Sequence, residues 1–188
     1  MMIISPASQR PPSSPSLAST QLNIVTLIDV AGTLRTGGLS GKTGLMDNGG
    51  ESTGKGTNSL RTVCRQGQAL NWLVYCTDME KRPDGSWPLF ARIVNIVFVL
   101  PDGTPELRKI CNDLKIYGGP DKIRSPWTPS YYYWAGAVDL ELEPGLYPYR
   151  LVVEVDTVDR NRKSYFNLDG PALQVIPLSA IHAGSQHG

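Results

Sequence analysis

The sequence predicts an all-β protein: one antiparallel β-sandwich domain, of the jelly-roll or immunoglobulin type, with one short helix and a disordered N-terminal tail. Three observations predict this class. The chain has 188 residues, 40% of them apolar, which is enough for one domain with a hydrophobic core. It contains 19 glycines and 15 prolines, which favour many short elements joined by turns. Its apolar runs are short, and several alternate with polar residues as half-buried strands do.

The domain organisation follows from composition along the chain. Residues 1–20 are rich in serine and proline, so we expect them to be disordered. The spacing of Pro12 and Pro15 leaves a second interpretation open, a polyproline II ligand for a partner domain. We expect residues 21–179 to form the single β-sandwich domain and residues 180–188 to be a frayed C-terminus.

Strands are predicted where β-branched and aromatic residues alternate or cluster between turn signals. In residues 69–76, for example, Leu70, Trp72 and Val74 share one face, as in a central strand. Turn signals at Pro101-Asp-Gly103 and Pro144-Gly145 separate such runs. The predicted strands are residues 22–30, 59–65, 69–76, 93–100, 131–138, 147–155 and 172–176.

One helix and one long loop complete the prediction. Residues 105–114 are predicted to be helical because Leu107, Ile110, Cys111 and Leu114 recur at helical spacing. Residues 35–57 are rich in glycine, so we expect a long, flexible loop there, interrupted only by a short apolar pair.

The charge pattern argues against nucleic acid and membrane partners. The net charge is +1, and acidic and basic residues are interspersed, so no basic stripe exists for a phosphate backbone. No uncharged apolar stretch is long enough to span a bilayer, and the apolar N-terminus is too short for a signal peptide. We therefore expect a cytoplasmic protein, with secretion by a signal-free route left open. The cysteines at positions 64, 76 and 111 are expected to be free thiols, and Cys64 and Cys76, which lie in apolar strand-like runs, are expected to be buried.

The motifs that would indicate an enzyme are incomplete. Residues 49–55 have the spacing of a phosphate-binding loop, but Gly56 stands where a hydroxyl must meet Mg²⁺, and no helix is predicted to follow. His182 and His187 lie in the C-terminal tail, where neither can be held beside a nucleophile. We therefore predict no catalytic residue, no cofactor and no metal ligand.

Two groups of acidic residues leave Ca²⁺ open as an alternative. Asp139, Glu141 and Glu143 would share one face of a strand, either as a solvated face with the intervening leucines in the core or as ligands of a hard cation. Asp47 and Asn48 lie with a nearby glutamate in the glycine-rich segment, at a spacing that matches no known calcium loop.

The segment most suggestive of ligand binding is residues 117–134, which holds two of the four tryptophans and four of the eight tyrosines. Aromatic rings stack on the C–H faces of sugars while polar side chains bond the hydroxyls. The predicted carbohydrate-binding residues are therefore Asp121, Arg124, Trp127 and Tyr131. A core or a protein interface is the competing interpretation, because half of residues 131–134 must point inward in a strand.

The order of several short motifs resembles one family. Ile28-Asp29, Leu45-Met46-Asp47-Asn48, the segment 54–60 and Gly67 before Trp72 follow one another as in bacterial inclusion-body proteins of the PixA type and the related quorum-regulated AidA proteins. The similarity covers mainly residues 22–78, and the N-terminal tail and residues 117–134 depart from the pattern. The resemblance implies a compact β-sandwich without known enzymatic activity whose members can accumulate as cytoplasmic inclusions. It also adds Asp47 and Asn48 to the predicted ligand-binding residues.

Two functions remain in view. The first is a non-catalytic, lectin-like protein that binds carbohydrate through loop aromatic residues. The second is a structural protein that self-associates into homo-oligomers or inclusions, favoured by the low net charge, which weakens repulsion between copies.

Overall fold

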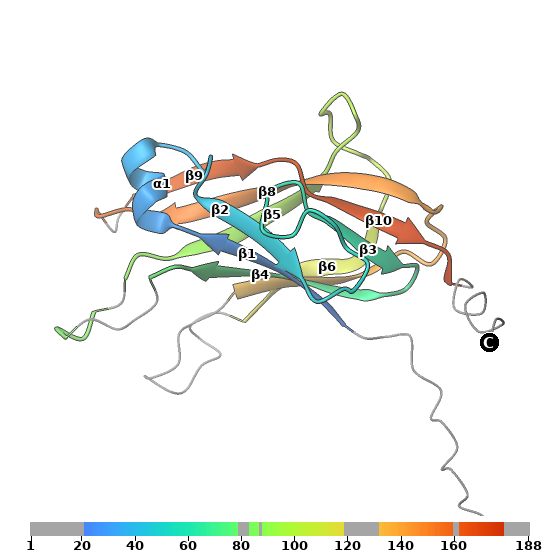
Figure 1. The fold of residues 1–188 in the computed structure, drawn as a ribbon, viewed down its shortest axis with the longest axis horizontal. Coiled ribbons are helices and arrows are strands. Elements are labelled where there is room, and N and C mark those ends of the chain that lie inside the picture. The colour runs from blue at the N-terminus through green and yellow to red at the C-terminus, as the bar shows by residue number, and fades with distance from the viewer. Residues whose placement is uncertain (1–20, 79–82, 87, 119–131, 160–161, 179–188) are drawn as a thin grey trace, which may run out of the picture.

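The computed structural model describes residues 21–78, 83–86, 88–118, 132–159 and 162–178. Within these ranges the chain forms one helix and ten strands arranged in two sheets (Figure 1). The tails predicted at 1–20 and 180–188 lie outside the described residues.

Each sheet contains five strands, and each has an open order. The first sheet runs, in spatial order, through β2 (Thr43–Asp47), β1 (Leu22–Ile28), β4 (Ala69–Cys76), β7 (Tyr132–Val138) and β6 (Cys111–Gly118). The second runs through β3 (Arg61–Arg65), β10 (Ala172–Ile176), β8 (Gly145–Asp156) and β5 (Ala91–Phe98), and β9 (Lys163–Leu168) pairs with β8. In the view of Figure 1, β1 and β4 lie below β5 and β8.

The prediction of purely antiparallel sheets is wrong, because each sheet is mixed. β1 pairs with β4 in parallel, and β3 pairs with β10 in parallel. A parallel pair needs a long crossover connection, and the chain between β1 and β4 supplies one by passing through β2 and then through β3 of the other sheet. Alternation within a strand reports which side is buried but not the direction of its neighbour, so the sequence pattern does not reveal this arrangement.

The inward faces of both sheets form one hydrophobic core. In β1 and β4 alternate side chains are buried, so Ile24 and Trp72, which are paired in register, face the same interior. Tyr149 and Leu151 of β8 face it from the second sheet. The Trp72 and Tyr149 rings meet edge to face, with centroids 6.1 Å apart. The predicted single core is therefore present, built between two mixed sheets.

The helix is not where the apolar spacing placed it. α1 spans Val30–Thr36; the Asp29 carboxylate accepts a hydrogen bond from the Gly32 N–H at 2.7 Å, and Gly37 ends the helix at φ 71°. The predicted helix at 105–114 is wrong: Pro105 bridges to Val99, and β6 already begins at Cys111. Strand pairing determines the structure there, with Val99 at Pro105 and with β7 from Cys111 onward, and the helical spacing of the apolar residues is coincidental.

The glycine-rich segment is ordered by strand pairing and not the flexible loop that its composition predicts. β2 forms within it, and isolated bridges join Leu45 to Thr57 and Thr53 to Arg61. Gly54 has φ +73°, and a Cβ there would lie 2.4 Å from the Ser59 carbonyl oxygen. Glycine is therefore needed at this position for close packing rather than for mobility.

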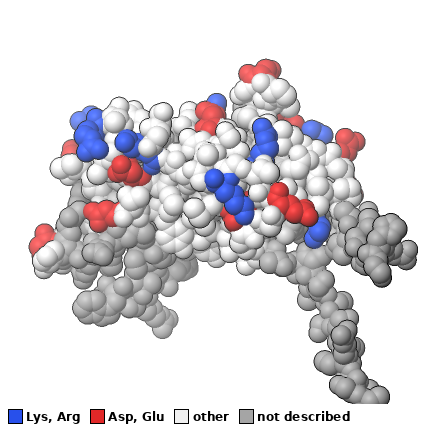
Figure 2. Space-filling view, viewed as in Figure 1, with Lys and Arg blue, Asp and Glu red and all other residues white. Residues whose placement is uncertain are grey.

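Charges are scattered over the face of the molecule drawn in Figure 2. Figure 2 shows basic and acidic side chains interspersed on the face in view, as the composition predicted. No helix in the described ranges is long and apolar enough to cross a membrane.

Candidate functional site

The outer face of the first sheet carries a continuous row of apolar side chains. The registers pair Val25 with both Met46 and Leu73, Leu73 with Tyr133, and Tyr133 with Tyr117. Each of the five strands thus contributes one residue to a single line across the sheet, on the side opposite the core. We call this line the central row; it consists of Met46, Val25, Leu73, Tyr133 and Tyr117.

The central row is accessible at both ends and broadened by neighbours. Met46 is 40% exposed and Tyr117 is 37% exposed; Leu27, beside the row on β1, is 36% exposed. The Tyr117 and Tyr133 rings stack with centroids 5.5 Å apart at 18°. Asp113 and Lys115 are the charged residues on this face of the described strands, and their charges cancel. A contiguous apolar surface with so little charge is typical of an interaction site.

A second line of polar side chains lies next to the central row. The Asn48 Oδ1 accepts a hydrogen bond from the Asn23 backbone N–H at 2.9 Å, and the Asn71 Nδ2 donates to the Asn23 Oδ1 at 2.8 Å. The Asn71 Oδ1 is buried and has no hydrogen-bond partner. Asn48, predicted as a ligand-binding residue, thus helps to hold this line of asparagines in place through Asn23. The acceptor of the line that has no partner is the Asn71 Oδ1.

A hollow of about 220 Å³ opens at the end of that line, where β6 is irregular. The β6–β7 register shifts between Asn112 and Lys115, and Asp113 in the bulge has φ 50°, the only positive φ at a non-glycine position in the described chain. Bulges re-aim side chains and are common beside functional sites. The hollow is lined by Gln21, Ala69, Leu70, Asn71, Asn112, Asp113, Tyr117, Ala135, Gly136 and Ala137.

Asp47, the other predicted ligand-binding residue of the glycine-rich segment, faces inward. Its side chain is 0% exposed. The Oδ2 accepts a hydrogen bond from the Thr62 hydroxyl at 2.6 Å, and the Oδ1 accepts one from the Gly49 N–H at 3.0 Å and lies 3.3 Å from the Lys55 Nζ. The carboxylate therefore joins β2 to β3 and to the loop between them.

The lysine of the incomplete phosphate-binding motif has a structural role. The Lys55 ammonium contacts the Asp47 carboxylate and donates to the carbonyl oxygens of Asp47 and Gly49. A phosphate-binding lysine projects toward the ligand from a loop that opens a helix. Here the loop leads into β3, and the lysine closes the loop on itself.

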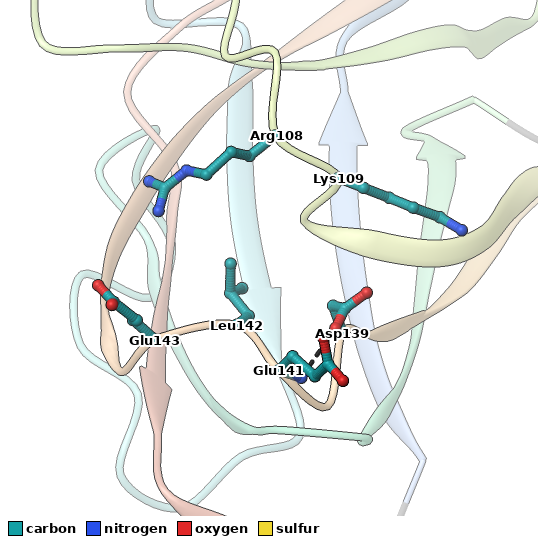
Figure 3. A pocket seen from close by; sticks show the side chains of 6 residues that line it. All are labelled: Arg108, Lys109, Asp139, Glu141, Leu142 and Glu143. Carbon is teal, nitrogen blue, oxygen red and sulfur yellow. Dashed lines mark hydrogen bonds between the residues drawn. The ribbon is translucent and has the colours of Figure 1, made fainter.

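Three acidic and two basic residues surround an open pocket of about 310 Å³ (Figure 3), lined by Arg108, Lys109, Asp139, Glu141, Leu142 and Glu143. The prediction that Asp139, Glu141 and Glu143 share one face of a strand is wrong: all three lie in the turn between β7 and β8. Leu140 is 63% exposed, so the expectation that both intervening leucines face the core is wrong; Leu142 alone does.

The turn explains the position of these acids. The Asp139 carboxylate accepts hydrogen bonds from the Glu141 N–H at 2.8 Å and the Asn112 Nδ2 at 3.0 Å, which closes the turn. In Figure 3 the Arg108 and Glu143 side chains lie apart across the pocket. Among the residues that the structure describes, no group of three or more His, Cys, Asp or Glu side chains could hold a metal ion.

The three thiols are free, and Cys64 and Cys76 are buried, as predicted; Cys111 is buried as well. Burial, with a smaller contribution from the Asp47 carboxylate, raises the pKa of the Cys64 thiol to about 12. Burial likewise raises the pKa of Cys111 to about 12 and raises that of Cys76. A thiol held in its neutral form is a poor nucleophile, so none of the three is a catalytic candidate.

The predicted carbohydrate-binding residues Asp121, Arg124, Trp127 and Tyr131 lie outside the described residues. The neighbouring aromatic residues divide between the two faces of β7, as strand alternation requires. The Trp134 Nε1 donates to the Ile93 carbonyl oxygen at 2.9 Å toward the second sheet, whereas Tyr133 belongs to the central row. Sequence reasoning missed the central row, although the outward positions of β1, β4 and β7 were readable from their alternation.

The fold and its outer face define the class: a two-sheet, mainly β protein with a nearly uncharged apolar sheet surface. A family model described as "Domain of unknown function (DUF8788)" matches residues 20–84. No curated protein matches the sequence.

Among solved structures, the chain is similar to the inclusion body protein PixA from Burkholderia cenocepacia J2315. The TM-score is 0.56 at 11% identity, over 87% of this chain and 99% of that one. At this identity the similarity shows a shared fold. This solved structure is thus that of a PixA inclusion body protein, the type of protein that the sequence motifs resemble.

Proposed function

We propose that this chain is a non-catalytic structural protein that self-associates, as an inclusion body protein does, through the outer face of its first sheet. The observation that carries the proposal is the central row, five apolar side chains in one line across five strands. The PixA structure with the same fold is that of an inclusion body protein, which supports the proposal.

The occupant we infer for this face is a second copy of the chain. An uncharged apolar row is self-complementary about a two-fold axis, since each side chain meets another apolar side chain. The net charge of +1 gives two copies little repulsion to overcome. On the described strands of this face, a strongly charged partner would find only Lys115 and Asp113 to pair with.

Light scattering after size-exclusion chromatography tests the proposal over a range of protein concentrations. We expect the unmodified chain, the parent, to form oligomers whose population rises with concentration. The double variant Leu27→Lys/Met46→Lys should stay monomeric. Both side chains are exposed, so the variant should fold normally.

The matched control is Leu140→Lys/Leu146→Lys, which adds the same charge at two exposed leucines outside the first sheet. It should self-associate like the parent. A parent that stays monomeric at high concentration, or a control that dissociates as fully as the test variant, would refute the proposal.

Carbohydrate binding by Trp127 and its neighbours stays a prediction from the sequence. A glycan array, run with calcium and with a chelator, tests it. Loss of binding in Trp127→Ala is the expected result for an aromatic site, and loss in chelator would instead identify a calcium-dependent site.

A further inference from the structure

A short hairpin between β5 and β6 projects from the body of the molecule, in yellow-green in Figure 1. Its two arms are joined by a bridge between Val99 and Pro105 and by a hydrogen bond from the Leu100 N–H to the Thr104 carbonyl oxygen at 2.8 Å. At its tip, the Asp102 carboxylate accepts hydrogen bonds from the Thr104 N–H at 2.9 Å and the Thr104 hydroxyl at 2.6 Å. These bonds fix the shape of the hairpin.

The end of this hairpin carries the most exposed large apolar side chain in the described part of the chain, Leu107, which is 96% exposed. The residues on either side of it are held together. The Glu106 carboxylate accepts hydrogen bonds from the Arg108 N–H at 2.9 Å and from the Arg108 guanidinium at 3.2 Å. Because the backbone is already fixed, little conformational entropy is lost when a partner buries the leucine.

A mainly apolar hollow of about 310 Å³, which we call the hairpin hollow, lies beside these residues. Tyr147 is a buried part of its lining, and Leu100 and Leu146, which are 39% and 45% exposed, form its accessible wall. Leu107 does not line the hollow, although both of its neighbours in the chain do. The hollow is large enough for an aliphatic side chain, since a cavity of about 150 Å³ already holds benzene.

We propose that Leu107 of one copy enters the hairpin hollow of another copy, as a second self-contact of this chain. The inference rests on the proposed self-association and deepens it. A two-fold contact through the central row is complete once two copies have met, so by itself it gives a dimer. A contact between two different surfaces of the chain need not close, so it links such dimers into a growing assembly.

The two surfaces match in charge as well as in shape. Leu107 lies between Glu106 and Arg108, and the same two residues line the hollow that receives it. In each copy these two charges are already paired, at 3.2 Å, so the contact buries no unpaired charge. The hairpin hollow shares no residue with the central row, and therefore both contacts form at the same time.

One inserted leucine is too small a contact to hold two monomers together. A dimer joined through the first sheet presents two such leucines and two hollows, and the contacts reinforce one another by multivalency. The monomeric variant Leu27→Lys/Met46→Lys should therefore stay monomeric although its hairpin is intact.

Sedimentation velocity of the full chain at rising concentration tests the second contact. We expect species larger than a dimer in the parent, and a dimer as the largest species in Leu107→Lys and in Leu100→Lys, which places a charge in the wall of the hollow. The matched control is Val158→Lys, which adds the same charge at an apolar side chain that is 87% exposed in another turn. It should assemble like the parent, with circular dichroism confirming the fold of each variant.

Mixing the two variants separates this contact from any other effect of the added charge. Leu107→Lys keeps its hollow and Leu100→Lys keeps its leucine, so an equimolar mixture should again form species larger than a dimer. Leu140→Lys/Leu146→Lys alters the hollow through Leu146, and it should match the parent at the dimer stage and stop there.

Three results would overturn the second contact. The first is growth of Leu107→Lys to the same size as the parent, which would give the exposed leucine another partner. The second is a mixture of the two variants that stops at the dimer. The third is a parent that forms dimers and nothing larger, which would leave the first-sheet contact standing. A parent that stays monomeric would refute both contacts.

Discussion

Lys55 contacts Asp47 twice: its Nζ lies 3.3 Å from the carboxylate Oδ1 and donates to the backbone carbonyl oxygen at 3.1 Å. With the Thr62 hydroxyl on the other carboxylate oxygen, this pair connects β2, the following loop and β3. The residues that resembled a ligand site in sequence thus stabilise the connection between the two sheets.

Removing this carboxylate should cost more stability than removing its lysine. Asp47→Ala leaves the Gly49 N–H and the buried Thr62 hydroxyl without their acceptor, and we expect a loss of about 3 kcal/mol in the free energy of unfolding. Lys55→Met keeps both hydrogen bonds and the aliphatic stem, and the lysine is 39% exposed; we expect about 1 kcal/mol. Urea unfolding followed by circular dichroism measures both, and equal losses would contradict this account.

Glycine should be required at one position of this loop and dispensable at another. Gly54→Ala forces a side chain to within 2.4 Å of the Ser59 carbonyl oxygen at a φ of +73°, and we expect a loss of about 2 kcal/mol or more. Gly50→Ala meets nothing within 4 Å and should be nearly neutral. Thermal unfolding of the pair compares them directly. If Gly54→Ala were as stable as Gly50→Ala, the loop would not be packed as described.

The thiols should be unreactive until the protein unfolds. Because burial raises the pKa of Cys64 and Cys111 to about 12 and raises that of Cys76, the thiolate is scarce in the native state. Ellman's reagent at about pH 8 should therefore modify no thiol rapidly in the native protein and all three in guanidinium chloride. Rapid reaction of one native thiol would show a local opening of the core.

Stability should fall in alkaline solution. In the unfolded chain a thiol ionises near its ordinary pKa of about 8.5, whereas Cys64 and Cys111 stay protonated up to about pH 12 in the fold. Below about pH 8.5 both states hold the proton, so stability is unaffected. Between the two values the unfolded state alone loses it, and the free energy of unfolding decreases as pH rises.

Urea unfolding at several pH values up to about 10.5 measures this slope. The double variant Cys64→Ala/Cys111→Ala should show a shallower decline than the parent, although its stability at neutral pH is lower. An identical slope would assign the alkaline sensitivity to other groups, such as Tyr149, whose pKa is also raised by burial.

Salt should not weaken self-association. If the central row is the contact, its apolar side chains are insensitive to screening, and raising NaCl from about 0.05 to about 0.5 M should leave the oligomer population unchanged or larger. Sedimentation velocity at the two salt concentrations provides the comparison. Dissociation at high salt would indicate a contact built from charged residues instead.

The strands were the most predictable part of the molecule, and the pairing between them the least. Residues 69–76 were predicted with the bounds that β4 has, because alternation and turn signals mark both ends. β2, β6 and β9 were missed, since glycine, polar residues and a bulge obscure their alternation. The helix was misplaced because spacing alone cannot distinguish a helical stripe from residues that sheet pairing buries.

The candidate site could be predicted only in its parts. Asn48 was identified, but its link to Asn71 through Asn23 depends on β1 lying between β2 and β4. Tyr117 was included in the aromatic segment, yet Met46, at the opposite end of the row, lies far away in the chain. No spacing rule relates residues on strands that become neighbours only through the topology.

The sequence by itself determined that this protein is mainly β, that its thiols are buried, and that a short run of motifs resembles inclusion-body proteins. These properties depend on local composition and alternation, which can be read from the chain without knowing how its distant segments pack. The tertiary structure decided which outward residues form one continuous surface, that Asp47 is buried, and that Asn71 retains a free acceptor beside a hollow. Those properties depend on strand order and register, which arise when distant segments bury their apolar faces together.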